Sequence, residues 1–324
     1  MAVRGPGAQW DSPVEHIVVL RALGLGDLLT GIPALRGLRR AFPDAAITLA
    51  TPQRFADLAM LSGAVTEVRA TAGLGSLRAA RAGQRPPDLA VNLHGSGPQS
   101  TADLLALRPK ALLTHRHRDH PELPGPPWRA DLHEVDRWCH LLQWYGIACD
   151  AEDLALPRPS GHPDFSGVVV IHPGAAFPAR RWPVERFAEV AAALRAAGHH
   201  VVVTGDAGET ELARSVVQLA GLPESSLLAG KLDVLGLVAL IGNCLLLICG
   251  DTGVGHVATA TGTPSVLLFG PTPPSKWGPR GGPHTALWAG NRGDPHGDEP
   301  HRGLLLITVP RVLDAARELL GVRA

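Results

Sequence analysis

Residues 245–269, LLLICGDTGVGHVATATGTPSVLLF, decide the fold class of this chain. The two ends of the stretch, 245–249 and 265–269, are predicted strands, because apolar residues at successive positions are typical of strands that are buried on both faces. The segment between them, 253–261, is a predicted helix. A strand, a helix and a second strand in this order form the repeating unit of a parallel sheet that is covered by helices.

The same alternation runs through most of the chain. Further strands are predicted at 16–22, 46–51, 88–94, 111–114, 168–172 and 200–204, and further helices at 27–41, 54–62, 184–197, 208–220, 233–242 and 309–320. Residues 154–167 interrupt the pattern with three prolines, as a linker does. We therefore predict an α/β protein of two domains, with ligands bound beyond the carboxyl ends of the strands and in the cleft between the domains.

Composition narrows the class of protein. The chain has 324 residues, of which 45% are apolar, enough for two domains of about 150 residues each. Its 30 basic and 30 acidic residues cancel, which argues against a nucleic-acid-binding protein and against permanent attachment to a membrane through a basic surface. Residues 1–13 lack a signal-peptide pattern, and no apolar stretch approaches the roughly 20 residues of a membrane span. We expect a cytoplasmic protein.

The four cysteines, Cys139, Cys149, Cys244 and Cys249, form no Cys-x-x-Cys pair. Their spacings are not those of a zinc site. In a reducing compartment they are expected to be buried free thiols.

The first segment that carries chemistry follows the strand at 16–22. Gly24 and Gly26 form a tight loop, and a helix opens at Asp27. A carboxylate near a helix N-terminus is stabilised in its ionised form by the helix dipole and can serve as a general base, although Asp is also a favoured N-cap residue. A dinucleotide-binding fingerprint is not matched, since Leu29 stands where its third glycine is expected.

The second segment, 171–183, reads IHPGAAFPARRWP and leaves a strand before it enters a helix. Its adjacent arginines, Arg180 and Arg181, suit a phosphate or a diphosphate, because a guanidinium group binds phosphate oxygens in pairs. The alternative is a solvated basic turn.

The third segment is the turn from strand to helix within the opening stretch. A buried strand ends at Asp251, and the N–H groups of Thr252 and Gly253 at the helix start form an anion site. The Thr252 hydroxyl adds a donor, and His256 in the first turn can face the same site. Three polar groups at one strand end favour a ligand site over a purely structural role.

Together the three segments resemble glycosyltransferase family 9, the heptosyltransferase family of lipopolysaccharide core assembly. The first match is GLGD at 24–27 with PAL at 33–35, and the second is HPGA at 172–175 with RRWP at 180–183. The most specific match is DTG at 251–253 through His256, followed by GTP at 262–264, FGPT at 269–272 and WGP at 277–279. The resemblance extends in order from about residue 18 to residue 320.

The resemblance implies a GT-B fold, with two Rossmann-like domains whose parallel sheets face a central cleft. Residues 1–155 would form the acceptor-side domain, residues 156–308 the domain that binds the nucleotide sugar, and residues 309–324 a C-terminal helix that packs back toward the first domain. It also implies inverting transfer without a metal or another cofactor, from a nucleoside-diphosphate sugar such as ADP-heptose to a glycan or glycolipid acceptor. No nucleic-acid partner and at most peripheral membrane association are expected.

Site residues are implied by the same resemblance. Asp27 matches the proposed catalytic base of the family. The residues expected around the phosphates and the ribose of the donor are Arg180, Asp251, Thr252, Gly253, His256 and one of Glu209 and Glu211. On the acceptor side we expect Gly24, Gly26 and His94.

Two other functions stay open at this point. A nucleotide-sugar epimerase with a GT-B-like fold would convert the donor without an acceptor, and a non-catalytic nucleotide-sugar-binding protein would have little need of Asp27. Two histidine-bearing stretches, 115–120 and 291–302, invite a metal-binding interpretation. We assign neither to a metal: the first is a candidate for acceptor-phosphate contact, and the second is expected to be a solvated loop.

Overall fold

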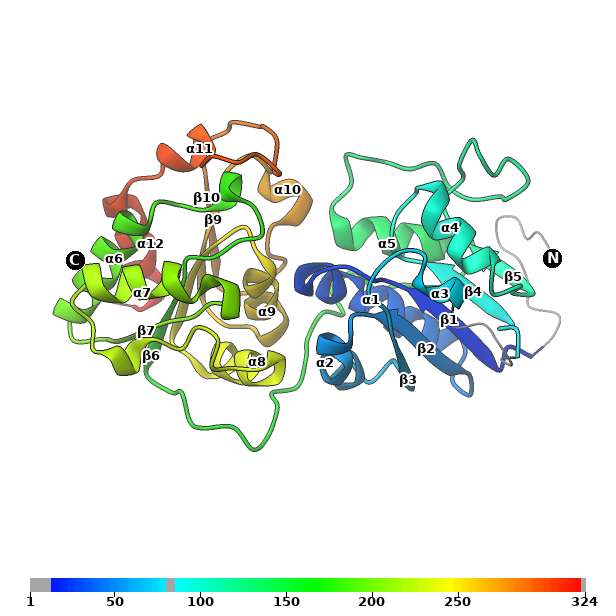
Figure 1. The fold of residues 1–324 in the computed structure, drawn as a ribbon, viewed down its shortest axis with the longest axis horizontal. Helices are drawn as coiled ribbons and strands as arrows, with labels where there is room; N and C mark the ends of the chain where they lie inside the picture. The colour runs from blue at the N-terminus through cyan, green and yellow to red at the C-terminus, as the bar shows by residue number, and fades with distance from the viewer. Residues whose placement is uncertain (1–12, 80–84, 322–324) are drawn as a thin grey trace. The chain divides into compact units, whose positions relative to one another are not determined.

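The computed structural model describes residues 13–79 and 85–321. The chain divides into two compact units, residues 1–154 and 155–324, and each contains a parallel five-stranded sheet flanked by helices (Figure 1). The predicted α/β class is therefore confirmed. No signal peptide was expected in residues 1–13, and residues 1–12 of that stretch lie outside the residues that the structure describes. Across 13–79 and 85–321, no helix combines the length and the apolar character needed to cross a membrane.

The first unit has the strand order β3-β2-β1-β4-β5. The chain pairs β1 with β2 on one side and then crosses over to pair β1 with β4 on the other, so the strand order reverses between β1 and β4. At the carboxyl ends of this pair, Leu20 lies opposite Asn92. The strands are β1 (His16–Leu20), β2 (Ala46–Thr51), β3 (Glu67–Ala70), β4 (Leu89–Asn92) and β5 (Ala111–Leu113). The helices are α1 (Leu25–Ala41), η1 (Gln53–Phe55), α2 (Ala56–Leu61), α3 (Ser76–Ala79), α4 (Pro98–Leu105) and α5 (Glu134–Trp144).

The core of the first unit explains its continuous apolar strands. In β1, the residues from Ile17 to Leu20 are all buried, because helices cover both faces of the sheet. Helix α1 packs against α5, and α4 packs against β4. This core fixes the loops that follow β1 and β4 at the point where the strand order reverses.

The second unit repeats this topology with the order β10-β9-β8-β6-β7. Here the order reverses between β6 and β8, where His172 lies opposite Cys249. The strands are β6 (Val168–His172), β7 (His200–Val203), β8 (Leu246–Gly250), β9 (Ser265–Phe269) and β10 (His284–Trp288). The helices are η2 (Pro178–Arg180), α6 (Val184–Ala196), η3 (Ala207–Glu209), α7 (Thr210–Leu219), η4 (Glu224–Ser226), α8 (Val234–Asn243), α9 (Gly253–Thr261), α10 (Pro274–Trp277), α11 (Arg302–Leu305) and α12 (Val309–Leu319).

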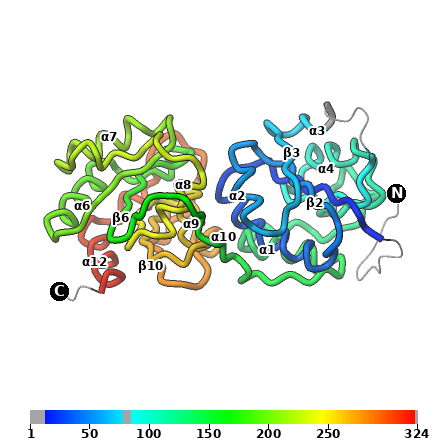
Figure 2. Tube along the Cα trace, turned by 90° about the horizontal axis from the view of Figure 1, so that it is seen from below, coloured from blue at the N-terminus to red at the C-terminus, as the bar shows by residue number. Residues whose placement is uncertain are grey.

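The last helix is part of the core of the second unit. Helix α12 packs within the second unit, beside α6 and against β8, β9 and β10 (Figure 2). Its buried residues, Val312, Ala315 and Ala316, belong to the apolar core of that unit. The apolar stripe of the helix therefore packs on the sheet of its own unit, as its spacing predicts.

The cysteines correct one expectation. Cys139 and Cys149 form a disulfide, so the prediction of four free thiols is wrong for this pair. After α5 ends, Gly146 adopts a φ of +81°, which turns the chain back and brings Cys149 to a Cα–Cα distance of 5.2 Å from Cys139. Cys244 and Cys249 are free and buried as predicted, and burial raises the pKa of Cys244 to about 12.

Candidate active site

The loop after β8 carries the predicted phosphate-binding turn. It leaves the carboxyl edge of the sheet beside the loop after β6, where the strand order reverses, which is the usual ligand position of open α/β sheets. Strand β8 ends at Gly250 and α9 begins at Gly253, with Thr252 as its N-cap residue. Among the described residues, the Thr252 side chain caps no N–H group of the helix, so its hydroxyl can join the first amides of α9 as a donor to an anion.

Asp251 lies beside this turn and is buried. Burial raises the pKa of Asp251 to about 6, while the charge of Arg180 and a hydrogen bond with Thr272 act in the opposite direction. Gly250 allows the Arg180 segment to approach, because a Cβ at position 250 would lie 2.9 Å from the Arg180 carbonyl oxygen. The structure thus brings Arg180 and Asp251 to the same strand edge.

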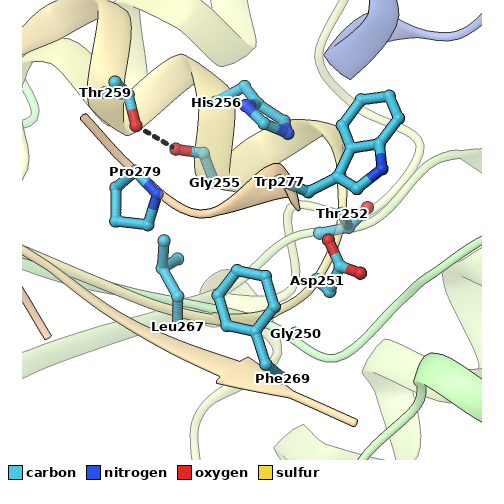
Figure 3. Close-up of a pocket in the computed structure, with 10 residues that line it drawn as sticks. All are labelled: Gly250, Asp251, Thr252, Gly255, His256, Thr259, Leu267, Phe269, Trp277 and Pro279. Carbon is cyan, nitrogen blue, oxygen red and sulfur yellow. Dashed lines mark hydrogen bonds between the residues drawn. The ribbon is translucent and has the colours of Figure 1, made fainter. Parts of the chain in front are cut away.

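A pocket with an empty volume of about 200 Å³, part of it open to solvent, adjoins the turn. Figure 3 shows Asp251, Thr252 and Trp277 at one end of it and Thr259 and Pro279 at the other. The ring of His256 meets the ring of Trp277 edge to face, with 5.8 Å between their centroids. The complete lining is Gly250, Asp251, Thr252, Gly255, His256, Thr259, Leu267, Phe269, Trp277 and Pro279. His256 therefore lines the same pocket as the candidate phosphate-binding turn.

The two adjacent arginines have different surroundings. Arg181 donates from Nε to the Ala175 carbonyl oxygen at 2.9 Å and so holds its own loop together. The Arg180 guanidinium lies over the ring of Phe177, with Cζ 5.6 Å from the ring centroid, and its charge acts on Asp251. Arg180 is therefore the member of the pair whose charge acts at the turn after β8.

The structure separates the two candidate ribose carboxylates. Glu209 lies against the loop after β6, where its Oε2 accepts a hydrogen bond from the Asp206 N–H at 3.0 Å and lies 3.7 Å from His172 Nε2. Burial lowers the pKa of His172, although the charges of Glu209 and Asp206 oppose this shift. Glu211 is 86% exposed and pairs with Arg214 of the same helix at 3.5 Å. Only Glu209 lies beside the loop after β6.

In the first unit, Asp27 lies in the first turn of α1, and Gly24 is the N-cap residue. The Asp27 carboxylate accepts a hydrogen bond from the Gly24 N–H at 3.1 Å through Oδ2. Its side chain is 28% exposed. The two interpretations of Asp27 are therefore compatible: the carboxylate closes the helix start and still reaches solvent.

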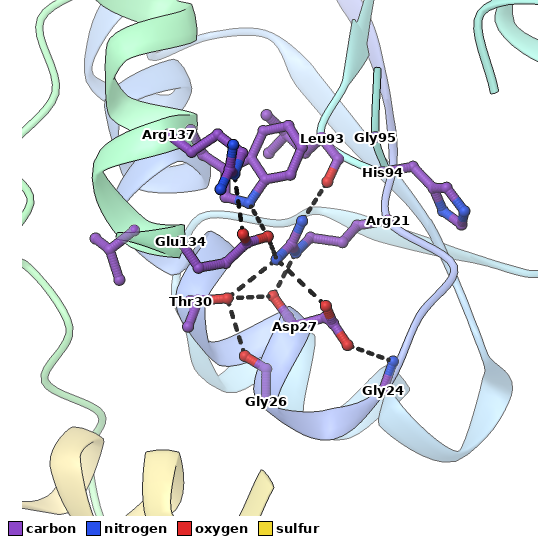
Figure 4. Close-up of polar contacts among 12 residues, drawn as sticks. Arg21, Gly24, Gly26, Asp27, Thr30, Leu93, His94, Gly95, Glu134 and Arg137 are labelled. Atoms are coloured by element: carbon purple, nitrogen blue, oxygen red, sulfur yellow. Dashed lines mark hydrogen bonds and ion pairs between the residues drawn. The ribbon is translucent and has the colours of Figure 1, made fainter. Parts of the chain in front are cut away.

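Behind Asp27 lies Arg21, which the sequence analysis missed. Arg21 is fully buried and donates hydrogen bonds to the carbonyl oxygens of Asp27 and Leu93 and, at 3.0 Å, to the Thr30 hydroxyl (Figure 4). The signal in the sequence was a charged residue directly after the apolar run 17–20. Its acidic partner Glu134 gave no local signal, because it reaches Arg21 from α5, far along the chain.

His94, expected on the acceptor side, lies at the same edge in the loop after β4. Its Nδ1 accepts a hydrogen bond from the Ala22 N–H at 3.2 Å. Burial and then the charge of Arg21 lower the pKa of His94, while Asp27 and Asp103 oppose the shift. The ring is therefore neutral near pH 7 and carries its proton on Nε2, where it can donate to a ligand.

The other histidine stretches have structural contacts. Burial lowers the pKa of His115 to about 4, and its Nδ1 lies 3.3 Å from the Pro126 carbonyl oxygen. His301 caps α11 by accepting from the Gly303 N–H at 3.2 Å, and the ring of His296 meets that of Phe177. Over the described ranges, no three His, Cys, Asp or Glu side chains form a group that could hold a metal ion.

Two Rossmann-like units in one chain, each with polar loops at the point where its strand order reverses, define a protein of the GT-B class. The chain belongs to glycosyltransferase family 9 (heptosyltransferase), whose family model matches residues 129–302. The resemblance drawn from the sequence motifs is confirmed.

Individual relatives agree with this assignment. Lipooligosaccharide heptosyltransferase 2 of Haemophilus influenzae is 34% identical over 162 residues, which cover 46% of this chain and 46% of that protein. The chain spans about half the length of the curated relatives it matches in this way. A family 9 glycosyl transferase of Veillonella parvula has a TM-score of 0.81 at 23% identity and covers 98% of this chain and 100% of its own. ADP-heptose LPS heptosyltransferase II of E. coli has a TM-score of 0.73 at 25% identity, over 94% of this chain and 98% of its own. These likenesses confirm the GT-B fold.

Proposed function

We propose that this chain is an inverting, metal-independent glycosyltransferase of lipopolysaccharide core synthesis. It would move a heptose or a related sugar from a nucleoside-diphosphate sugar to a glycan or glycolipid acceptor. ADP-heptose is the first donor to test, because the solved E. coli relative is described as an ADP-heptose enzyme. Family membership supports the type of reaction, and the residues of the two strand edges support its steps.

The second unit would bind the donor. The diphosphate would accept hydrogen bonds from the Thr252 hydroxyl and the first amides of α9, at the positive end of the helix dipole. The guanidinium of Arg180 would add a charge-assisted contact and stabilise the negative charge that develops on the leaving diphosphate. Glu209, at the edge of the same sheet, would accept from the ribose hydroxyls.

The first unit would supply the base. The Asp27 carboxylate takes the proton of the acceptor hydroxyl, and the oxygen attacks the anomeric carbon as the bond to the diphosphate breaks on the opposite face. The nucleoside diphosphate leaves with the electron pair of that bond, so the configuration at the anomeric carbon inverts. His94, with its proton on Nε2, would orient the acceptor by donating a hydrogen bond.

The observation that supports the proposal most directly is the position and exposure of the Asp27 carboxylate. A carboxylate that is held by the Gly24 N–H and is still 28% exposed has a fixed position and an open side, as a general base needs.

The test uses the full chain with ADP-heptose and a heptose-free lipopolysaccharide acceptor. Mass spectrometry should show an acceptor one sugar heavier, NMR should show the inverted anomeric configuration, and excess EDTA should leave the rate unchanged. A changed sugar in the absence of acceptor would indicate an epimerase instead. Loss of transfer on chelation, restored by Mg²⁺ or Mn²⁺, would exclude the metal-independent mechanism.

A further inference from the structure

We propose that Arg21 is a positioning residue that holds Asp27 in its catalytic orientation, and that Glu134 balances the Arg21 charge. The inference rests on the proposed function, in which Asp27 is the base. Arg21 is fully buried, so it acts on the reaction only through Asp27 and the loops around it.

The contacts of Arg21 join three parts of the first unit. Through Nε and Nη1 it donates to the carbonyl oxygens of Asp27 in α1 and of Leu93 after β4. Its Nη2 lies 3.0 Å from the Thr30 hydroxyl oxygen and 3.3 Å from Oε1 of Glu134 in α5. One guanidinium therefore ties the first turn of α1 to the strand edge that carries His94 and to a second helix.

The space around Arg21 permits little movement. A Cβ at Gly31 would lie 2.9 Å from both Cδ and Nε of Arg21, so α1 approaches the Arg21 side chain at a position that has no side chain of its own. On the other side, the Arg21 guanidinium carbon lies 4.8 Å from the ring centroid of Trp138. The Thr30 hydroxyl contacts the carbonyl oxygens of Gly26 and Asp27, each at 3.0 Å. The close packing fixes the guanidinium, and its hydrogen bonds fix the first turn of α1.

Four charges of alternating sign run from α5 to the site. Arg137 Nε lies 3.0 Å from Glu134 Oε2, Arg21 Nη2 lies 3.3 Å from Glu134 Oε1, and the same Nη2 lies 3.9 Å from Asp27 Oδ1 (Figure 4). The side chains of Arg137, Glu134 and Arg21 are 7%, 10% and 0% exposed, against 28% for Asp27. Of these four side chains, only that of Asp27 is substantially open to solvent.

The charge of Glu134 is maintained by its partners. Burial alone would raise the pKa of Glu134, but the charges of Arg21 and Arg137 outweigh burial and keep it below its ordinary value. Glu134 therefore stays ionised and offsets part of the field that Arg21 exerts on Asp27. A buried arginine without such a partner would be costly to the fold.

This arrangement predicts a loss of turnover without a loss of donor binding. Arg21 holds the first turn of α1 in the first unit, whereas the proposed donor site lies in the second unit. Loss of the guanidinium fork releases the turn that carries Asp27 and lowers kcat, but leaves the donor KM close to that of wild type. A merely structural residue would lower thermal stability and donor binding together with kcat.

The experiment measures kcat and donor KM for Arg21→Met, Arg21→Lys and Glu134→Gln. Arg36→Met is the matched control, because Arg36 lies in the same helix and also pairs with a carboxylate, that of Asp153 at 2.6 Å, but two turns or more from Asp27. Thermal melting and ADP binding to the second unit report whether each variant is folded.

We expect Arg21→Met to lower kcat about 100-fold, as the misplacement of a catalytic group does, with the donor KM within threefold of wild type. Glu134→Gln also lowers kcat with little change in donor KM, because it weakens the contact that holds Arg21 Nη2. Arg21→Lys, which keeps the charge but loses the fork of donors, recovers part of kcat. Arg36→Met keeps both kcat and donor KM.

The proposal is overturned if Arg21→Met and Glu134→Gln lower kcat no more than Arg36→Met, or if their donor KM rises as much as kcat falls. Should Arg21→Met fail to fold, kcat and donor KM of Arg21→Lys and Glu134→Gln decide. Asp27→Asn is measured in parallel. If it still transfers sugar, Asp27 is not the base and the proposed function fails. If it is inactive while Arg21→Met keeps the kcat of wild type, only the role of Arg21 fails.

Discussion

The Glu209 carboxylate occupies the space that a side chain at position 174 would need. A Cβ on Gly174 would lie 2.1 Å from Oε1 and 2.2 Å from Cδ of Glu209. The glycine of the motif after β6 thus makes room for a carboxylate from the loop after β7. Two loops that are separate in the sequence form one side of the candidate donor site.

The first prediction follows from this contact. Gly174→Ala should displace the Glu209 carboxylate and weaken ADP binding by about 10-fold, with little change in melting temperature, because the clash involves the end of a flexible side chain. Glu209→Gln should show a similar loss in calorimetry. Glu211→Gln is the control and should bind like wild type, since that side chain is 86% exposed. Equal losses for Glu209→Gln and Glu211→Gln would contradict the assignment.

The second prediction concerns stability and pH. Burial raises the pKa of Asp251 to about 6, above its value in the unfolded chain, so the associated stability is present at low pH and is lost as the pH rises from about 4 to about 6. Asp251→Asn should therefore raise the free energy of unfolding by about 3 kcal/mol at pH 8 and by about half of that at pH 5. Denaturant titrations at both pH values provide the measurement. The exposed control Asp298→Asn should change little at either pH.

A destabilised Asp251→Asn at pH 8 would mean that the contacts of the ionised carboxylate with Arg180 and Thr272 outweigh its burial.

The third prediction separates the adjacent arginines. Arg180→Ala should weaken ADP binding by about 1.5–3 kcal/mol, the range for a charge-assisted hydrogen bond, because its charge acts on Asp251 beside the proposed phosphate-binding turn. Arg181→Ala should weaken ADP binding by less than about threefold, since the Arg181 guanidinium donates its hydrogen bond within its own loop. Gly253→Val should also weaken binding, by placing a branched side chain where the ligand approaches the backbone. Wild-type affinity for both Arg180→Ala and Gly253→Val would show that the donor phosphates bind elsewhere.

Most of the fold could be predicted because its central strands are buried on both faces. The continuous apolar runs of β1, β6 and β8 mark them in the sequence. The edge strands β3 and β10 were missed, because their residues are largely half-buried or exposed and give no such run. The edge strands β5 and β7 were predicted, because most of their residues are apolar and buried.

The candidate site was predictable where its residues are neighbours in the sequence. Asp251, Thr252 and Gly253 follow one strand and open one helix, so a single motif contains their geometry. The contact of Arg21 with Glu134 joins residues 113 positions apart, and only the packing of α1 on α5 produces it. Periodicity describes which face of a helix is buried, but not which side chain of a distant helix it meets.

The last prediction tests the base. Asp27→Asn should lower kcat by about 10²–10⁴, the usual cost of losing a general base, and should leave ADP affinity within a few fold of wild type. The amide is nearly the same size as the carboxylate. It retains an oxygen that can accept a hydrogen bond from the Gly24 N–H, as Oδ2 of Asp27 does at 3.1 Å. The helix start should therefore persist, and the melting temperature should change by only a few degrees.

The control is Asp44→Asn, which changes an exposed carboxylate after the end of the same helix and should leave turnover unchanged. If Asp27→Asn retains near wild-type turnover with a verified acceptor, Asp27 only closes the helix start. If Asp27→Asn instead unfolds, its turnover cannot report on the base. Asp27→Glu then provides the test: it keeps the carboxylate but moves it by one methylene, and it should show reduced but measurable transfer.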